Sequence, residues 1–393
     1  MKALVVAPQP FFSPRGTPFS VYYRTMILSE LGVEVDLLTY GEGEDVIIPN
    51  VNIIRIPRFK FLGSVKLGPS FLKLFLDFFL FGKFISRLTK NKYDFVHAHE
   101  EAVFMALFLK PIFNFKLVYD VHSSLPQQLK NFQFSSSKLL LRIFEKLEKA
   151  SLKKADAVIT ICPDLRDYVN KIIDKKEKHF LIENSIFESV KTVGSKTVDD
   201  DETLSSKILS NINGDKIVAY AGTLEKYQGI DILIRSFRTV LEKSPNTKLL
   251  IVGGTKEQVE SFSKLASELK ISENVIFTGR VSQRIAKKIN IRADVLVSPR
   301  ISGTNTPLKI YEQISSGKPL VATNIYSHTQ VLDNNVAFLV DPDSDSMANG
   351  IIESLKSDVT VSQKVKNAKR LFEENYSRDV YISKMKKLLE LLR

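Results

Sequence analysis

Short apolar runs and longer amphipathic stretches follow one another along the whole chain. The apolar runs are rich in Val, Ile and Leu, as in buried strands, and the stretches between them repeat their apolar positions at helical spacing. The predicted strands are residues 2–7, 33–39, 94–98, 116–121 and 157–162 in the first half, and 216–221, 248–252, 274–279, 294–298, 319–323 and 337–340 in the second. Strands that alternate with helices form βαβ units, so the pattern predicts an α/β fold with parallel sheets covered by helices.

A length of 393 residues is more than one hydrophobic core usually organises, so we expect two domains. Residues 191–215 are polar, with a DDDE run and several Ser, Asn and Gly residues. We place the interdomain boundary near Asn184, before this segment. The halves are predicted to be two copies of one architecture, residues 1–184 and 185–377, followed by a last helix from about 378 to 393.

The composition is that of an ordinary globular protein, with 44% apolar and 25% charged residues. The single cysteine, Cys162, excludes a disulfide framework and a cysteine zinc site, and is typical of a reducing cytoplasm. The opening residues, MKALVVAPQP, lack the long apolar core and cleavage site of a signal peptide, and no apolar run is long enough for a membrane-spanning helix. We therefore expect a cytoplasmic protein.

The net charge of +12 is unevenly distributed. Residues 55–92 hold nine Lys and Arg against one acidic residue, Asp77, with Phe and Leu between them. This pattern favours a helix that lies in the interface of an anionic membrane, apolar side down and lysines toward the head groups. The alternative is a core helix of the first domain with solvated cations. The segment carries no RNA- or DNA-binding motif, so we expect no nucleic-acid partner.

Residues 298–323, SPRISGTNTPLKIYEQISSGKPLVAT, hold the most informative loop. A strand runs into small residues and Pro307, and a helix begins there and ends at Gly317. Small residues allow close approach of backbone N–H groups, and a helix N-terminus carries partial positive charge, so the pattern predicts a phosphate site. Glu312, further along the helix, is placed to accept hydrogen bonds from sugar hydroxyls. A nucleotide or nucleotide-sugar fits both features.

Four sequence blocks, at residues 221–237, 249–254, 275–281 and 309–323, carry a resemblance whose order and spacing are specific. The chain resembles a GT-B glycosyltransferase of family 4, the glycosyl transferases group 1 or glycogen-synthase-like type. The resemblance implies two Rossmann-like, doubly wound parallel-sheet domains that face each other across a cleft. It implies a nucleoside-diphosphate-sugar donor held mainly by residues 185–377, an acceptor site within 1–184, and a last helix that crosses back onto the first domain. It also implies transfer with retention of configuration and no obligatory metal or other cofactor.

The donor site departs from the family pattern at three positions. Thr304 stands where the family has the first of two glutamates, while Glu312 matches the second, which the resemblance implies binds ribose. Thr223 and Gln228 stand where the family has the Arg and Lys that contact the diphosphate. A departing diphosphate needs charge stabilisation, so we assign that role to Lys309, with Arg300 and Arg280 behind it. The other predicted donor contacts are the small residues of two loops: Gly222, Gly303, Thr304, Asn305 and Thr306.

The first domain supplies candidates near the donor and the acceptor. Gly16 fits the family's glycine loop after the first strand, and Arg15 is a candidate for attracting an anionic or lipid-phosphate acceptor. His122 matches a family histidine near the hydroxymethyl group of the donor sugar. Asp120 is expected to point away from His122, so we assign it no role as a base.

The sequence His97-Ala98-His99-Glu100-Glu101 allows two interpretations. His97 and His99 share one strand face and could chelate a metal, but zinc needs a third or fourth ligand and no Cys/His cluster supplies one. We therefore predict no metal site and place His99 and Glu100 on the acceptor side.

These features predict a retaining glycosyltransferase that acts on a lipid-linked or saccharide acceptor, in surface-polysaccharide or glycolipid synthesis at the inner face of the cell membrane. Two alternatives stay open: a GT-B nucleotide-sugar epimerase, and a sugar-nucleotide-binding protein that has lost catalysis. A nicotinamide dehydrogenase is disfavoured, because the first strand leads into PQPFFSPRGTP instead of Gly-x-Gly-x-x-Gly.

Overall fold

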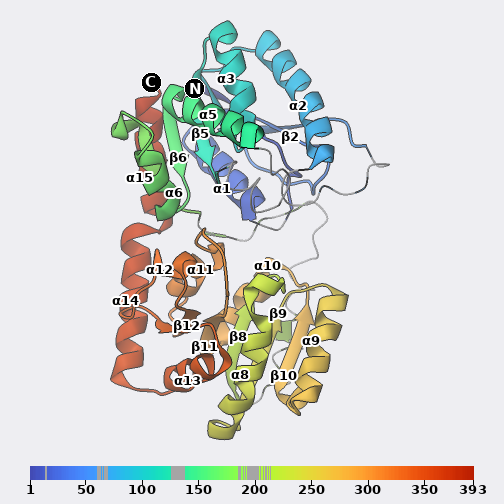
Figure 1. The fold of residues 1–393 in the computed structure, drawn as a ribbon, viewed down its shortest axis with the longest axis vertical. Helices are drawn as coiled ribbons and strands as arrows, with labels where there is room; N and C mark the ends of the chain where they lie inside the picture. Colours follow the sequence, from blue (N-terminus) through green and yellow to red (C-terminus); the bar gives the residue numbers. More distant parts are fainter. Residues whose placement is uncertain are drawn as a thin grey trace. The chain divides into compact units, whose positions relative to one another are not determined.

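The computed structural model in Figure 1 divides into two compact units. It describes residues 1–13, 16–59, 70–124, 138–184 and 214–393, together with single positions between 63 and 65 and between 187 and 212. One unit contains Met1–Asn184 and Arg378–Arg393, and the other contains most of Gly194–Ser377. Each unit has its own parallel sheet and its own hydrophobic core.

The first unit is built on a seven-stranded parallel sheet of order β3-β2-β1-β4-β5-β6-β7. Its strands are β1 (Lys2–Ala7), β2 (Glu34–Thr39), β3 (Val51–Arg55), β4 (Phe95–His99), β5 (Lys116–Val121), β6 (Ala157–Thr160) and β7 (His179–Leu181). Its helices are α1 (Gly16–Glu30), α2 (Phe71–Lys90), α3 (Ala102–Phe113), α5 (Lys138–Lys154), α6 (Pro163–Asn170) and α15 (Arg378–Leu391), with the 3-10 turn η2 (Lys176–Lys178). The strands β1, β4 and β5 are buried along nearly their whole length, which explains their continuous apolar runs.

The second unit is built on a six-stranded parallel sheet of order β10-β9-β8-β11-β12-β13. Its strands are β8 (Lys216–Ala221), β9 (Thr247–Val252), β10 (Val275–Gly279), β11 (Val295–Ser298), β12 (Leu320–Thr323) and β13 (Phe338–Val340). Its helices are α8 (Ile230–Lys243), α9 (Lys256–Glu268), α10 (Gln283–Arg292), α11 (Leu308–Ser315), α12 (Tyr326–Thr329), α13 (Ser344–Ser354) and α14 (Val359–Asn375), with the 3-10 turns η3 (Lys226–Gln228) and η4 (Ser272–Asn274).

Alternation along β8 shows how helices cover both faces of this second sheet. Val218 and Tyr220 enter one apolar cluster together with residues of α8, α9 and α13. Ile217 and Ala219 enter another cluster with residues of α10 and α11. Successive strand side chains point to opposite faces, so the two clusters lie on opposite sides of the sheet. The predicted α/β fold of two Rossmann-like parallel-sheet domains is confirmed.

Two strands were not predicted from the sequence. β3 is only half-buried and β7 is three residues long, so neither has the long apolar run that marked the other strands. Both lie at the edges of the first sheet, where one side of the strand needs no apolar neighbour. The other strands begin or end within two residues of their predicted bounds.

Helix α2 contains most of the basic segment, and it has two different faces. Leu76, Leu80, Phe84 and Leu88 recur every four residues and are buried in the core of the first unit. Phe71 and Phe78 are 81% and 74% exposed, on the other side. The core-helix interpretation therefore holds for one face only. Among the described residues, no helix combines the length and the apolar character that crossing a membrane requires.

Candidate active site

Lys309 lies in the first turn of α11 and reaches the loop that follows β8. Its Nζ donates a hydrogen bond to Oε1 of Gln228, 3.1 Å away, and lies 4.1 Å from the ring centre of Tyr220. Gln228 itself is buried at the end of η3. Because α11 and this loop follow the carboxyl ends of adjacent parallel strands, they meet at one edge of the sheet.

Within the part of the chain that the structure describes, Lys309 has no counter-charge. Desolvation by burial, and then the charge of Arg300, hold the pKa of Lys309 well below its usual value. Among the described residues, no carboxylate lies within ion-pair distance of its ammonium group. A buried cation in this situation is stabilised by an incoming anion, which a diphosphate would supply.

Gly222 packs closely against Tyr220 beside this lysine. Its φ is +155°, and a Cβ added there would lie 2.9 Å from the hydroxyl of Tyr220 and 3.7 Å from Nζ of Lys309. The neighbouring Thr223 is exposed, and its carbonyl accepts a hydrogen bond of 2.6 Å from the Tyr220 hydroxyl. The structure thus brings together the predicted donor residues Gly222, Thr223, Gln228 and Lys309.

The Arg300 side chain contacts the backbone of its own loop and the ring of Tyr227 in η3. Its Nε donates to the carbonyl of Ser302 at 2.6 Å, and its guanidinium lies over the ring of Tyr227 at 5.2 Å. A Cβ at Gly303, where φ is +131°, would overlap this guanidinium at 2.0 Å. Arg300 therefore shapes the loop of Gly303, Thr304, Asn305 and Thr306, and acts on Lys309 through its charge.

Glu312 lies one turn after Lys309 on α11 and is half-buried. Burial raises the pKa of Glu312, while the charge of Lys287 and a hydrogen bond from Asn290 oppose the rise.

The Thr304 backbone carbonyl accepts a hydrogen bond from Gln330, and the Thr306 hydroxyl is buried. Neither residue brings a charge to the loop.

A hollow of about 450 Å³ opens beyond the carboxyl ends of β9 and β10. It is lined by glycines and by longer side chains, among them Gly254, Thr255, Phe277, Gly279 and Arg280. The Arg280 side chain is exposed there, and no contact joins it to Lys309 among the described residues. The prediction that Arg280 supports Lys309 stays untested, and its place in the hollow suits a more distant part of a ligand.

In the first unit a buried cluster of histidines surrounds Asp120. Oδ2 of Asp120 accepts from Nε2 of His97 at 3.0 Å, and its Oδ1 lies 3.5 Å from Nε2 of His122. Nδ1 of His99 lies 3.0 Å from Nε2 of His122, and the guanidinium of Arg24 pairs with Asp120 at 2.9 Å. The expectation that Asp120 points away from His122 is wrong, because residues two apart on a strand share a face.

The same cluster contains Asp120, a third possible metal ligand beside His97 and His99 that the sequence did not reveal. One ligand atom each of His97, His99 and Asp120 lie within 4.8 Å of one another. However, Asp120 already forms a buried ion pair with Arg24, whose fixed positive charge opposes a cation at this place. The residues therefore fit a hydrogen-bonded network better than a metal centre.

Glu100 belongs to an acidic cluster at the end of β4. Burial, and then the charge of Glu101, raise the pKa of Glu100 to about 7. The same two causes raise the pKa of Asp77 to about 7, although Tyr40 donates a hydrogen bond to it at 2.6 Å. Lys73 lies 3.4 Å from Glu101 and is the cation of this cluster.

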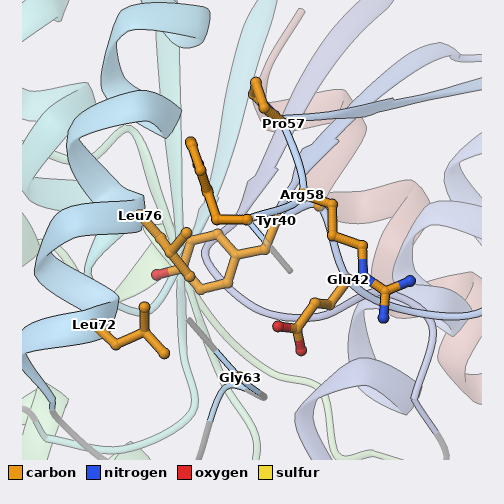
Figure 2. Close-up of a pocket in the computed structure, with 9 residues that line it drawn as sticks. Tyr40, Glu42, Pro57, Arg58, Gly63, Leu72 and Leu76 are labelled. Atoms are coloured by element: carbon orange, nitrogen blue, oxygen red, sulfur yellow. The ribbon is translucent and has the colours of Figure 1, made fainter. Parts of the chain in front are cut away.

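A small pocket beside Tyr40 is too narrow for a sugar (Figure 2). Its walls include Tyr40, Glu42, Arg58, Leu72 and Leu76, and it encloses about 10 Å³. That space holds about one water molecule.

Two candidates of the first unit remain. Gly16 begins α1, and a Cβ added there would meet nothing within 4 Å; Arg15 lies outside the described residues.

Several residues of these sites were not singled out from the sequence. Tyr220 supports Lys309, Arg24 pairs with Asp120, and Tyr381 accepts a hydrogen bond from Arg24. His328 is buried between Ser298 and Thr323, beneath the loop of Arg300. Arg24 was the available signal in the sequence, because it stands among the apolar residues of α1 and a buried charge needs a partner.

Two separate α/β units, each with polar loops at the carboxyl ends of parallel strands, define a two-domain Rossmann-like protein of the GT-B class. The family model described as Glycosyl transferases group 1 matches residues 201–372, and the one described as Glycosyltransferase Family 4 matches residues 16–186. The chain belongs to the group 1 glycosyl transferases of the GT-B fold and is a glycosyltransferase, as its sequence predicted.

Similar proteins extend over nearly the whole chain. An uncharacterized glycosyltransferase of Methanocaldococcus jannaschii is 23% identical over 349 residues, which are 87% of this chain and 85% of that protein. The sucrose-phosphate synthase of Thermosynechococcus elongatus has a TM-score of 0.75 at 20% identity and covers 100% of this chain and 98% of that one. HepE of Anabaena, solved in complex with UDP and glucose, has a TM-score of 0.71 at 17% identity and covers 99% of both chains. At these identities the solved structures show the fold.

Proposed function

We propose that this glycosyltransferase moves a sugar from a nucleoside-diphosphate-sugar to an acceptor hydroxyl, with retention of configuration. The observation that carries the proposal is the position of Lys309. Its ammonium group has no carboxylate partner among the described residues and lies beside Gly222 at the N-terminus of α11. HepE, which has the same fold, was solved with UDP and glucose, and this supports a nucleotide-sugar donor.

In the proposed reaction the diphosphate is the leaving group. Lys309 and the first backbone N–H groups of α11 stabilise the negative charge that develops as the glycosyl bond breaks. Gln228 orients Lys309 through their hydrogen bond of 3.1 Å. Thr304 has no carboxylate to serve as a nucleophile, so we propose attack by the acceptor on the face that the diphosphate leaves, with a phosphate oxygen receiving the proton.

We propose the remaining contacts of donor and acceptor from the family resemblance. Glu312 accepts hydrogen bonds from the ribose hydroxyls, and the hollow beside Phe277 and Arg280 receives the base. His122 contacts the hydroxymethyl group of the donor sugar, while His99 and Glu100 lie on the acceptor side. We propose that the reaction needs no metal, since the ammonium group of Lys309 and the helix N–H groups supply the stabilising charge.

We further propose that the acceptor is a lipid-linked or membrane-bound saccharide. Support comes from the exposed face of α2, where Phe71, Leu74 and Phe78 face solvent in a segment rich in Lys and Arg. Phe108 and Ile112 of α3 extend this apolar surface, because the rings of Phe81 and Phe108 lie 6.3 Å apart. Such a surface suits peripheral binding to the cytoplasmic, anionic face of a membrane, where surface-polysaccharide or glycolipid synthesis takes place.

The test is a titration with UDP, GDP, ADP and dTDP, followed by thermal unfolding, on the wild type and on Glu312→Ala. Bound ligand raises the free energy of unfolding by about 2.7 kcal/mol at a hundredfold excess over Kd. We expect one nucleotide to stabilise the wild type and to have a much smaller effect on the variant. No stabilisation by any of the four would overturn the proposed donor site.

Turnover separates the proposal from its alternatives. The corresponding sugar nucleotides are incubated with and without vesicles of bacterial lipid extract, and nucleoside diphosphate and glycolipid are measured. Glycosyl transfer requires both products together. Free nucleoside diphosphate with an epimerised sugar would indicate the epimerase, and binding without turnover would indicate the degenerate protein that the neutral Thr223, Gln228 and Thr304 leave open.

A further inference from the structure

The last helix of the chain is hydrogen-bonded to the histidine cluster of the first unit through two buried side chains. The Tyr381 hydroxyl, on α15, accepts a hydrogen bond from Nη1 of Arg24 on α1. Nε of Arg24 donates to Oδ2 of Asp120 on β5 at 2.9 Å, and Nη2 of Arg24 donates to the carbonyl of Ile182 at 2.6 Å. Each of the three guanidinium nitrogens thus donates a hydrogen bond, and together these bonds hold one orientation.

This arrangement is costly to build, which indicates a purpose beyond packing. Arg24 and Asp120 are both fully buried, and a buried ion pair is commonly no more stabilising than an apolar pair of the same size. A helix that only had to pack could be anchored by its apolar residues, and α15 does bury Met385, Leu388 and Leu389. The pair is therefore better explained by what Asp120 contacts on its other side.

Asp120 orders the three histidines. It accepts from Nε2 of His97, so the carboxylate holds that proton and fixes which nitrogen of His97 is protonated. Its second oxygen lies 3.5 Å from Nε2 of His122, and Nδ1 of His99 lies 3.0 Å from the same nitrogen. These contacts limit His122 to one ring orientation.

Burial, more than the surrounding charges, keeps the ring of His122 neutral. Desolvation lowers the pKa of His122 to about 4; Asp120 opposes the shift, while Arg24 and His97 add to it. Burial also holds the pKa of His99 well below its usual value, and Arg24 holds that of Asp120 low. At neutral pH the rings of His99 and His122 are therefore uncharged, and they lie beside the carboxylate of Asp120 and the guanidinium of Arg24.

We propose that Tyr381, Arg24 and Asp120 are positioning residues for His122, and that the last helix completes the catalytic site of the first unit through them. The inference rests on the proposed function, in which His122 contacts the donor sugar. Arg24 sets the orientation of Asp120, and Asp120 sets that of His122. Loss of any link lets the His122 ring rotate away from the sugar without removing the residues that bind the nucleotide.

Tyr381→Phe tests this most cleanly, because it removes one hydroxyl and keeps the ring. Its matched control is Lys384→Met on the same helix, which breaks an ion pair with Glu183, 2.8 Å long, that does not touch the cluster. We expect Tyr381→Phe to lower kcat about tenfold, with the KM for the donor and the Kd for the nucleoside diphosphate unchanged. Lys384→Met should leave kcat within twofold of wild type.

A second readout does not depend on activity. The chain has five histidines, so ¹⁵N spectra of histidine-labelled protein can be assigned with single His→Gln variants. We expect Tyr381→Phe to shift the ring signals of His97 and His122 and to leave those of His179 and His328 in place. In Arg24→Gln the pKa of His122 should rise, because a nearby positive charge has been removed.

The two hypotheses fail differently. If the wild type turns over no sugar nucleotide, the proposed function fails and the spectra still decide whether the contacts order the cluster. If the wild type is active and His122→Gln is impaired, normal kcat and unchanged His122 signals in Tyr381→Phe would overturn the positioning role. Asp120→Asn is informative only if its circular dichroism matches the wild type, since it leaves Arg24 buried without a counter-charge.

Discussion

Nζ of Lys309 and Oε1 of Gln228, 81 positions apart in the sequence, lie 3.1 Å from each other in the second unit. The family resemblance implies cations at positions 223 and 228, and this chain has Thr223 and Gln228 there. The contact shows how a neutral residue at one of these positions can still serve the site, because it holds a lysine that comes from another helix.

Replacing this lysine tests whether it binds the diphosphate. Lys309→Met should raise the Kd for the preferred nucleoside diphosphate roughly 10- to 100-fold, because a charge-assisted hydrogen bond contributes about 1.5–3 kcal/mol. The measurement is isothermal titration calorimetry. Lys318→Met, three residues after the end of α11, is the matched control and should bind as wild type does; equal affinity in both variants would remove Lys309 from the site.

The pKa of Lys309 adds a pH dependence. Only the charged amine attracts a phosphate, so binding is strongest below the pKa of Lys309 and is lost as the pH rises through it. Since burial and Arg300 lower this pKa, wild-type affinity should fall at a lower pH than an ordinary lysine would allow. Lys309→Met should lack this alkaline loss, and Kd values measured in one buffer series would decide.

Gly222 is predicted to be needed because a side chain there would press on Tyr220 and lie close to Lys309. In Gly222→Ala the added Cβ would meet the Tyr220 hydroxyl at 2.9 Å and lie 3.7 Å from Nζ of Lys309, and φ is +155°. We expect weaker nucleotide binding and a lower melting temperature. Gly317→Ala is the control, since its φ is also positive, at +73°, but its Cβ would meet nothing within 4 Å. It should lose stability and keep its affinity for the nucleotide.

Asp77 gives a stability prediction whose sign follows from its raised pKa of about 7. An unfolded aspartate ionises near pH 4, so between about pH 4 and 7 the folded protein binds more protons than the unfolded chain, and its stability falls as the pH rises. Asp77→Asn should therefore raise the melting temperature at pH 8 and lose this advantage near pH 4. Glu177→Gln, at an exposed carboxylate, is the control and should leave the melting temperature unchanged at both pH values. An equal effect of Asp77→Asn on the melting temperature at pH 4 and pH 8 would contradict the raised pKa of Asp77.

The two faces of α2 predict very different losses of stability when a phenylalanine is replaced. Phe84→Ala empties a fully buried position and should cost about 3–5 kcal/mol of unfolding free energy. Phe78→Ser changes a side chain that is 74% exposed and should cost less than about 0.5 kcal/mol. Combined with Phe71→Ser and Leu74→Ser, it should abolish co-sedimentation with vesicles that contain an anionic lipid. Retained sedimentation in the triple variant would refute membrane contact through this face.

The limits of sequence reasoning are clearest at Asp120. The local pattern correctly placed Asp120 on a strand and His122 at its end, but assigned them to opposite faces, although a spacing of two puts them on the same face. Even with the correct face, nothing in the sequence connects Asp120 to Arg24, which lies 96 positions away, or Arg24 to Tyr381, 357 positions away. Such contacts depend on which helices cover a sheet, and a local pattern does not contain that information.

The sequence by itself determined the alternation of strands and helices, and with it the polar loops at the carboxyl ends of β8 and β11. These features are local: burial of a strand on both faces requires an apolar run, and a loop before a helix requires small residues and a proline. The tertiary structure decided that Lys309 meets Gln228, that Arg300 is used within its own loop, and that α2 has a buried and an exposed face. It decided them because a side chain's partner depends on how distant segments pack, while its own neighbours in the chain set only the direction in which it points.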